Sequence, residues 1–403
     1  MRDSWSSSRP STSRRTGSAE VAEILVVATG GAGGDLPPLL AASLALRDRG
    51  HEVTFVGDAS VEHVVAPFHL AVDVLPKEVD LGPRIARVAH EAMQATAGDR
   101  AKAGPMIQRG LTVWAHDVAR PLSQSIERQR PNAIVTSLFG VEAVDATCPS
   151  NPWAVVNSTF YIGPHPPRPI EEDIGPRALP LVKRLAELLE APDLVLHATD
   201  QVFDYSFDRL PSRHHYVGPL GIWESPSERP TYLDEPGDPW ILVSISSLRQ
   251  DDLALADATI EALADAPVRV LVTLGPEHDP SELSSPPTNT RVEKTVSHSA
   301  VLERAVLLVS HAGHGTVMKA LWQGKPMVLI PWGRDQPGVA ARAEALGVAE
   351  VVPCAQASVQ TIGAAVRRCL TNHEMAATAA QHSARLRATD PPATAAAHLE
   401  SLL

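Results

Sequence analysis

Residues 311–316 combine glycines with side chains that can donate hydrogen bonds to an anion. The segment reads His-Ala-Gly-His-Gly-Thr, follows the apolar run 306–309, and opens a helix that we expect to reach about Gln323. A helix N-terminus presents free N–H groups and the positive end of its dipole, and glycines allow the backbone to approach a ligand closely. His311 and Thr316 can add hydrogen bonds. A diphosphate would suit this loop, and an ordinary glycine-rich connection is the alternative.

The two histidines of this segment, His311 and His314, also raise the alternative of a metal site. They are three residues apart, but no third ligand accompanies them at a recognisable spacing. The three cysteines, Cys148, Cys354 and Cys369, are scattered without a C-x-x-C pair, which indicates neither a zinc site nor a disulfide framework. We therefore expect no metal and no cofactor, and a reducing cytoplasm as the location.

A second polar pair, Asp335-Gln336, lies on the loop 331–337, directly after the apolar run 327–330. A carboxylate accepts hydrogen bonds, whereas an amide both donates and accepts them, so together they match two neighbouring hydroxyls of a sugar. The alternative is that Asp335 only caps the following helix.

The loops with these residues follow short apolar runs of the kind that form buried parallel strands. Leu36, Leu40 and Leu44 recur every four residues between two such runs, and Gly50 ends that helix, so the first ordered unit is strand, helix, strand. The alternation continues along the chain and predicts an α/β protein with two Rossmann-like, doubly wound parallel sheets facing a cleft. The expected strands are 24–28, 53–56, 133–136, 154–157 and 194–197, and then 241–245, 268–274, 306–309 and 327–330.

A chain of 403 residues exceeds one ordinary hydrophobic core, which favours two domains. We expect a disordered tail at 1–21, which is rich in Ser and Arg, and domains at 22–218 and 219–403. The stretch 218–239, dense in Pro and Gly, is the predicted linker. The C-terminal helix is a candidate to pack back on the first domain.

The overall composition excludes two classes of partner. Hydrophobic residues make up 44% and charged residues 20%, as in a folded globular protein, and no apolar run approaches the ~20 residues that span a bilayer. The formal net charge of −12 argues against nucleic acid, whose binding depends on concentrated Lys and Arg.

Three segments together resemble the donor signature of family 1 glycosyltransferases: 310–316, Gly324-Lys325-Pro326, and 333–337, which reads Gly-Arg-Asp-Gln-Pro. The chain is most similar to the bacterial branch that glycosylates antibiotics and other natural products. This resemblance covers nearly the whole chain after residue 22. It implies the GT-B fold, with an N-terminal acceptor-binding domain and a C-terminal nucleotide-sugar-binding domain, and UDP- or dTDP-sugar as the cosubstrate.

The same resemblance assigns the donor site. Asp335 and Gln336 would hold the sugar, and Val296 and His298 the nucleobase. The base-binding loop of the family usually contains Val-Pro-Gln or Val-Pro-His, whereas here Ser297 replaces the proline and the stacking aromatic residue of some members is absent, which leaves the choice of UDP or dTDP open. The residues that would hold the diphosphate are Ser246, Ser247, His311, Gly313, Gly315 and Thr316.

The acceptor side of the resemblance lies in residues 31–38, which are similar to the family's Gly-x-x-Gly-Asp-x-x-Pro loop and include Gly33 and Gly34. Asp35 is the candidate catalytic base. Many relatives carry His there with a distant Asp, while the vancomycin-type enzymes carry Asp, and the region 136–139 here lacks an Asp partner. The implied reaction is metal-independent displacement with inversion at the anomeric carbon. A helix N-cap is the alternative role for Asp35.

For the acceptor, the sequence indicates only a small, hydrophobic, ring-containing natural product, and we expect a hydroxyl group as its nucleophile. We expect its pocket in loops around 75–115 and 160–180. The sugar, the linkage and the oligomeric state, monomer or homodimer, stay open. Apolar side chains that would line the pocket, or would belong to the core instead, are Met93, Met106, Trp114, Phe139, Phe160 and Tyr161.

Three other functions are alternatives. A nicotinamide-dependent oxidoreductase would need a third glycine where Leu36 stands, and Pro37-Pro38 stiffens the segment that should wrap the pyrophosphate. A GT-B sugar epimerase shares the fold and the donor. A non-catalytic auxiliary protein of the same fold is disfavoured because Asp35, His311 and the Asp335-Gln336 pair are intact.

Overall fold

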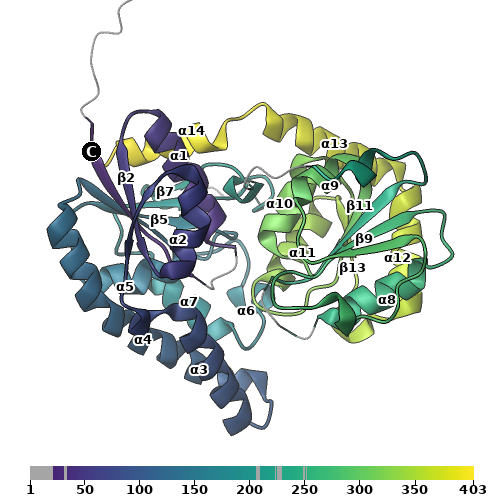
Figure 1. Cartoon of the computed structure of the whole chain (residues 1–403), viewed down its shortest axis with the longest axis horizontal. Coiled ribbons are helices and arrows are strands. Elements are labelled where there is room, and N and C mark those ends of the chain that lie inside the picture. The colour runs from purple at the N-terminus through teal and green to yellow at the C-terminus, as the bar shows by residue number, and fades with distance from the viewer. Residues whose placement is uncertain are drawn as a thin grey trace, which may run out of the picture.

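The computed structural model describes residues 21–403 apart from 31–33, 206–208, 223, 225–228, 248–249 and 251. The described residues form two parallel β-sheets of seven and six strands, each with helices on its faces (Figure 1). This confirms the predicted architecture of two doubly wound α/β sheets.

The N-terminal sheet has the strand order β3-β2-β1-β4-β5-β6-β7, and every neighbouring pair is parallel. The order reverses between β1 and β4, and ligands of open α/β sheets bind at such a switch point beyond the carboxyl ends of the strands. The strands are β1 Glu23–Val27, β2 Glu52–Gly57, β3 Ala71–Val74, β4 Ala133–Ser137, β5 Trp153–Asn157, β6 Leu194–His197 and β7 His214–Tyr216.

Helices α3 and α4 correct the expectation of loops at 75–115. Apolar side chains recur every three or four residues in α3, and Trp114 of α4 is buried, with its Nε1 donating to the Val79 carbonyl at 2.7 Å. Pro105 and Pro121 lie inside α4. Because proline usually ends a helix, these two residues argue against a long helix in the sequence. The helices of this domain are α1 Leu36–Asp48, α2 Ala59–Val65, α3 Leu81–Ala95, α4 Arg100–Gln129, α5 Val141–Asp145, α6 Ile170–Asp173 and α7 Leu179–Leu188.

The C-terminal sheet has the order β10-β9-β8-β11-β12-β13, again with parallel neighbours only. Its strands are β8 Trp240–Ser244, β9 Arg269–Thr273, β10 Thr290–Glu293, β11 Ala305–Ser310, β12 Met327–Leu329 and β13 Ala349–Val351. The helices are α8 Leu253–Leu263, α9 His298–Arg304, α10 His314–Trp322, α11 Gln336–Ala345, α12 Val359–Thr371, α13 His373–Arg387 and α14 Pro391–Glu400. None of the helices described in either domain is both long and apolar enough to cross a membrane.

The chain passes between the two sheets twice. The first passage follows β7 and contains the short 3-10 helices Leu220–Ile222 (η4) and Thr231–Asp234 (η5). In the second, α13 and α14 run back from the C-terminal sheet, and α14 packs on α1 (Figure 1). The Arg49 guanidinium donates to the Glu400 carboxylate of α14 at 2.6 Å. Gly218, whose backbone is left-handed (φ +89°), lies against Pro391, so the two passages are adjacent.

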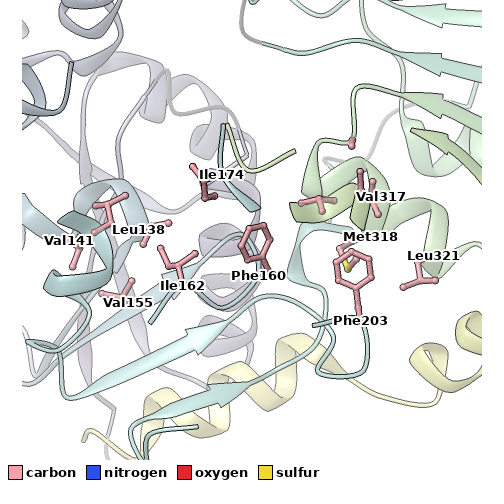
Figure 2. Packing of buried hydrophobic residues seen from close by; sticks show 14 of the residues in the cluster. Leu138, Val141, Val155, Phe160, Ile162, Ile174, Phe203, Val317, Met318 and Leu321 are labelled. Atoms are coloured by element: carbon pink, nitrogen blue, oxygen red, sulfur yellow. The ribbon is translucent and has the colours of Figure 1, made fainter. Parts of the chain in front are cut away.

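Buried apolar side chains continue from one domain into the other. Figure 2 shows Phe203 of the N-terminal domain beside Met318 of α10, and Phe160 and Val317 belong to the same cluster of buried residues. The Thr199 hydroxyl lies 3.9 Å from the Met318 sulfur in the same region. The two domains therefore share part of one apolar core instead of meeting only through polar surfaces.

Candidate active site

Asp35 occupies the N-cap position of α1 but does not cap the helix with its side chain. Its buried carboxylate accepts hydrogen bonds from the Ser158 hydroxyl and, at 3.2 Å, from the backbone N–H of Phe139. These partners follow β5 and β4, of which β4 neighbours β1 and β5 lies on the other side of β4. Proline at the first turn favours the helix start without a cap. Asp35 therefore stands at the N-cap position without a side-chain capping bond, because its carboxylate bonds to Ser158 and Phe139 instead.

Burial raises the pKa of Asp35 from 3.8 to about 6. Hydrogen bonds from Ser158 and Phe139 oppose this rise, and the negative charge of Asp335 adds to it. A carboxyl group with a pKa near 6 exchanges a proton readily at neutral pH, which is what a general base requires.

Asp335 precedes α11 and likewise makes no side-chain cap. Its Oδ2 accepts from the hydroxyl of Thr159 at 2.6 Å. Since Ser158 bonds to Asp35, two adjacent residues after β5 contact the predicted base of one domain and the predicted sugar-binding carboxylate of the other. Sequence reasoning missed Ser158 and Thr159, and the available signal was their position directly after the predicted strand 154–157.

The buried Asn157 holds these two hydroxyl residues in place. Its Oδ1 accepts from the Thr159 N–H at 3.2 Å, and its Nδ2 donates to the Phe160 carbonyl at 2.9 Å. The same Nδ2 lies 3.0 Å from Nδ1 of His197, whose Nε2 lies 3.0 Å from Nδ1 of His214. Burial lowers the pKa of both histidines, so this row of hydrogen bonds is neutral and rigid.

Gln336 is almost entirely buried, and its amide supports the loop around it. Oε1 accepts from the N–H groups of Trp332 and Gly333 at 2.8 and 2.9 Å, and Nε2 donates to Gln250 at 3.1 Å. An amide has two N–H donors, so a sugar hydroxyl would have to use the second one. The predicted sugar contact of Gln336 therefore rests on a single N–H group, while Asp335 is the more open member of the pair.

The predicted diphosphate residues lie at the carboxyl ends of β8 and β11. Ser246 is buried and donates its backbone N–H to Asp252 at 2.8 Å, and Ser247 beside it is exposed. Nη1 of Arg334 lies 3.5 Å from the Ser246 hydroxyl. Arg334, which sequence reasoning missed, has a left-handed backbone (φ 56°) and brings a positive charge to this loop. The only sequence signal was its place beside Asp335.

His311 is buried between these loops, and its Nδ1 donates to the Ser244 carbonyl at 3.2 Å. Because a carbonyl can only accept, Nε2 of the neutral ring carries the lone pair. A Cβ on Gly313 would lie 2.6 Å from this Nε2, so a larger residue there would displace the His311 ring. Gly313 is also the N-cap of α10 and provides no side-chain cap, which leaves the helix N-terminus available to a ligand.

The rest of the 311–316 loop faces the other domain. His314 points away from His311, with Nε2 2.9 Å from the Thr199 hydroxyl, and burial lowers its pKa to about 4. Gly315 packs against Gly221 of η4, where a Cβ on Gly221 would lie 3.3 Å from the Gly315 Cα. Thr316 is half-buried in the first turn of α10. Among the residues that the structure describes, no three His, Cys, Asp or Glu side chains gather as metal ligands.

The predicted nucleobase loop is held by a residue of the linker. Glu224 accepts from the N–H groups of His298 and Ser299 at 3.1 and 3.0 Å, from the Ser297 hydroxyl, and from Lys319 at 2.6 Å. Burial alone would raise the pKa of Glu224, but Lys319 and these donors outweigh it and lower the pKa to about 2.

In the same loop, Nε2 of His298 lies 3.0 Å from the Thr273 hydroxyl, and Val296 packs against the core. The backbone N–H groups that this loop would offer a nucleobase, those of His298 and Ser299, therefore already have a partner in Glu224. In the acceptor loop, Gly34 is exposed and Gly33 lies outside the described residues.

The apolar residues proposed for the acceptor pocket belong mainly to the core. Phe160 and Tyr161 are each 1% exposed, and Phe160 packs between the domains against Gly338. Met93 and Met106 pack against the same core as Trp114. Of these six, Phe139 donates its backbone N–H to a predicted site residue, Asp35.

Comparison with known proteins shows what this arrangement resembles. The family model "Glycosyltransferase family 28 C-terminal domain" matches residues 252–392, which include His311 and Asp335. The chain is similar to demethyllactenocin mycarosyltransferase of Streptomyces fradiae, with 25% identity over 92% of this chain and 85% of that protein.

Solved structures agree along nearly the whole chain. The glycosyltransferase of kitacinnamycin superposes with a TM-score of 0.74 at 22% identity, covering 95% of this chain and 99% of that one. Spinosyn rhamnosyltransferase in complex with thymidine diphosphate superposes with a TM-score of 0.69 at 18% identity, covering 92% and 98%. At these identities the superpositions establish the arrangement of the two domains.

Proposed function

This chain belongs to the family 1 glycosyltransferases of the GT-B fold, and from that premise we propose that it transfers a sugar from a UDP- or dTDP-sugar to a hydroxyl group of a small hydrophobic natural-product aglycone. The observation that carries this proposal is the pair Ser158-Thr159, which brings Asp35 of one domain and Asp335 of the other to the same loop. The proposed base and the proposed sugar-binding group then lie at one loop, at the boundary between the proposed acceptor and donor domains.

The proposed reaction is a direct displacement at the anomeric carbon. The acceptor hydroxyl oxygen forms a bond to that carbon while the carbon–oxygen bond to the diphosphate breaks on the opposite face, so the configuration inverts. Asp35 takes the hydroxyl proton, and its raised pKa suits this step. Asp335 orients the sugar so that the two oxygens stay in line.

The leaving diphosphate would be stabilised by groups of the C-terminal domain. The open N-terminus of α10, the Thr316 hydroxyl and the Ser246 hydroxyl can donate hydrogen bonds, and Arg334 brings a positive charge. Because this set supplies both donors and charge, we propose that transfer needs no divalent cation. The cytoplasmic location and the oligomeric state stay predictions.

Calorimetric titration of the EDTA-treated protein with UDP, dTDP and NADH tests the proposal. We expect saturable binding of at least one pyrimidine diphosphate without added metal, and the tighter one identifies the donor class. Binding of NADH alone would contradict a glycosyltransferase, and binding that returns only with Mg²⁺ would contradict metal independence.

His311 is expected to take up a proton when the diphosphate binds. Burial lowers its pKa, so the ring is neutral in the free protein near pH 7, with the lone pair on Nε2. A diphosphate beside Nε2 favours the imidazolium, which raises the pKa of His311 in the complex. Affinity should therefore be highest at low pH and fall as pH rises through that raised pKa. The charged groups that also face the ring are Asp252, Arg334 and Asp335.

Calorimetry in two buffers of different ionisation enthalpy measures this proton uptake. His311→Asn keeps a donor for the Ser244 carbonyl but lacks Nε2, so we expect it to lose the uptake and about 10- to 100-fold in affinity, the range of one hydrogen bond to a charged group. His63→Asn, on the exposed face of α2, is the matched control. Equal proton uptake by wild type and His311→Asn would show that another group titrates.

A further inference from the structure

Arg342 is an arginine with no exposed side-chain surface, and it lies on α11 seven residues after Asp335. Its Nε donates to Asp204 at 2.6 Å and its Nη1 to Asp173 at 2.7 Å. Both carboxylates are buried, and both belong to the N-terminal domain. The charge of this C-terminal-domain residue is therefore balanced entirely from across the domain interface.

Asp204, which pairs with Arg342, is itself held by other residues of the N-terminal domain. The second oxygen of Asp204 accepts from the Tyr161 N–H at 2.6 Å and from the Tyr216 hydroxyl at 2.7 Å. Tyr161 follows the Ser158-Thr159 pair by two residues. The carboxylate that receives Arg342 is thus fixed to the same loop that contacts Asp35 and Asp335.

Two aromatic rings pack against the guanidinium of Arg342. Its central carbon lies 3.8 Å from the centre of the Phe160 ring and 4.7 Å from that of Tyr205. One turn earlier on α11, a Cβ on Gly338 would lie 2.6 Å from the Phe160 ring, so only glycine permits this approach of the helix. Figure 2 shows Phe160 at the boundary of the two domains, with Ile174 of the segment after α6 nearby.

A second contact fixes the start of α11. The N–H of Gly175, two residues after α6, donates to the Arg334 carbonyl at 2.7 Å. The segment from Arg334 to Arg342 is thereby held to the N-terminal domain at both ends, and Asp335 lies within it.

The physical chemistry makes this an all-or-none contact. A buried guanidinium is stable only while its carboxylates and aromatic partners stay in place, because an unpaired buried charge is strongly unfavourable. A small separation of the domains therefore breaks the pairs and hydrates all three charges. Intermediate positions lose the pairing without gaining full hydration.

We propose that Arg342 is a positioning residue that locks α11 onto the N-terminal domain and thereby sets Asp335 against Thr159 and Asp35 in the geometry needed for transfer. The consequence for transfer rests on the proposed function, whereas the lock itself does not. Arg342 touches neither donor nor acceptor in this assignment, since it acts through α11.

The lock is tested first without any substrate. Spin labels at two exposed positions, Val113 on α4 and Leu370 on α12, report the distance between the domains after Cys148 and Cys354 are replaced by Ser. We expect one narrow distance distribution in the parent protein and a broader, longer one in Arg342→Met. An unchanged distribution in Arg342→Met overturns the lock, whether or not the protein transfers a sugar.

Kinetics test the positioning role. Arg342→Met should lower kcat by about 100-fold, the effect of a displacement of about 1 Å, while affinity for the nucleoside diphosphate, held by the C-terminal domain, stays within about threefold. Arg342→Lys keeps the positive charge but lacks the planar guanidinium with its paired N–H donors, so its kcat should lie between those of the parent and Arg342→Met. The matched control is Arg368→Met, which removes an exposed arginine paired with Glu350 within the C-terminal domain.

Two kinetic outcomes would overturn the positioning role. One is an Arg342→Met kcat within twofold of the parent, and the other is a parallel loss of kcat and diphosphate affinity, which indicates general damage. If Arg342→Met fails to fold, Asp173→Asn is the substitute, since it removes one carboxylate at constant shape. This variant must also lower kcat while the affinity for the nucleoside diphosphate stays unchanged. Equal kcat in Asp173→Asn and the parent overturns the role as well.

Discussion

Asp35→Asn is expected to lower the rate of sugar transfer by about a thousandfold, within the range that a positioned general base supplies. Asparagine keeps the shape and can still accept from the Phe139 N–H, but it cannot take the proton of the acceptor hydroxyl. Affinity for the nucleoside diphosphate should not change, because that ligand is assigned to the other domain. Single-turnover transfer and calorimetry on the same preparation separate the two, and full activity of Asp35→Asn would remove Asp35 as the base.

The pH dependence gives the same prediction a second readout. In the parent protein kcat/KM should rise about tenfold per pH unit below a pKa of about 6 and level off above it, because only the ionised Asp35 accepts a proton. Asp35→Asn should lack this rise.

Asp35→Asn should also make the protein more stable at neutral pH. The folded pKa of Asp35, about 6, lies above its ordinary value of 3.8, so the folded state binds the proton more tightly than the unfolded state. Ionising the buried carboxyl then lowers the free energy of unfolding progressively between pH 3.8 and 6, by about 3 kcal/mol in total. The variant lacks this loss. Its melting temperature should exceed that of the parent at pH 8 and match it below pH 4, and a lower melting temperature at pH 8 would contradict the burial argument.

Asp335→Asn is expected to lower kcat/KM for the nucleotide sugar by about 100-fold, at the upper end of what charge-assisted hydrogen bonds contribute. The nucleoside diphosphate without its sugar should bind as before. Asp279→Asn, at an exposed turn of the same domain, is the matched control. Equal losses for the nucleotide sugar and the diphosphate would place Asp335 at the diphosphate or in the structure of the loop.

Asp335→Asn should also move the pH profile of transfer. The negative charge of Asp335 contributes to the raised pKa of Asp35, so its removal should shift the midpoint of the kcat/KM profile to lower pH. An unmoved midpoint would mean that the two carboxylates do not sense each other in the working enzyme.

The sequence predicted the interior of both sheets well and their edges poorly, for a physical reason. Strands such as β4 and β8, with a neighbour on each side and helices on both faces, are continuous apolar runs and were expected within one residue of each end. The four strands that were missed, β3, β7, β10 and β13, are the edges of the two sheets. Each has a single neighbour and mixed burial, so its composition resembles a loop.

The site divides in a similar way. Asp35, His311 and Asp335 were found because each stands in a local motif next to a strand end. Ser158 and Thr159 were not, because hydroxyl residues after strands are common and their partners lie 123 and 176 residues away in the chain. Their role becomes visible only when the two domains are placed together.

The two passages of the chain between the domains lie side by side at Gly218 and Pro391. One covalent connection and one helix, α14 packed on α1, thus join the domains at the same place, and together they oppose sliding and twisting but permit rotation about a common axis. Separation of the two domains should then be a single rotation, with the largest displacement at parts far from Gly218. Removal of residues after α13 would remove the packing of α14 on α1, and the rotation would become a less restricted motion of the domains.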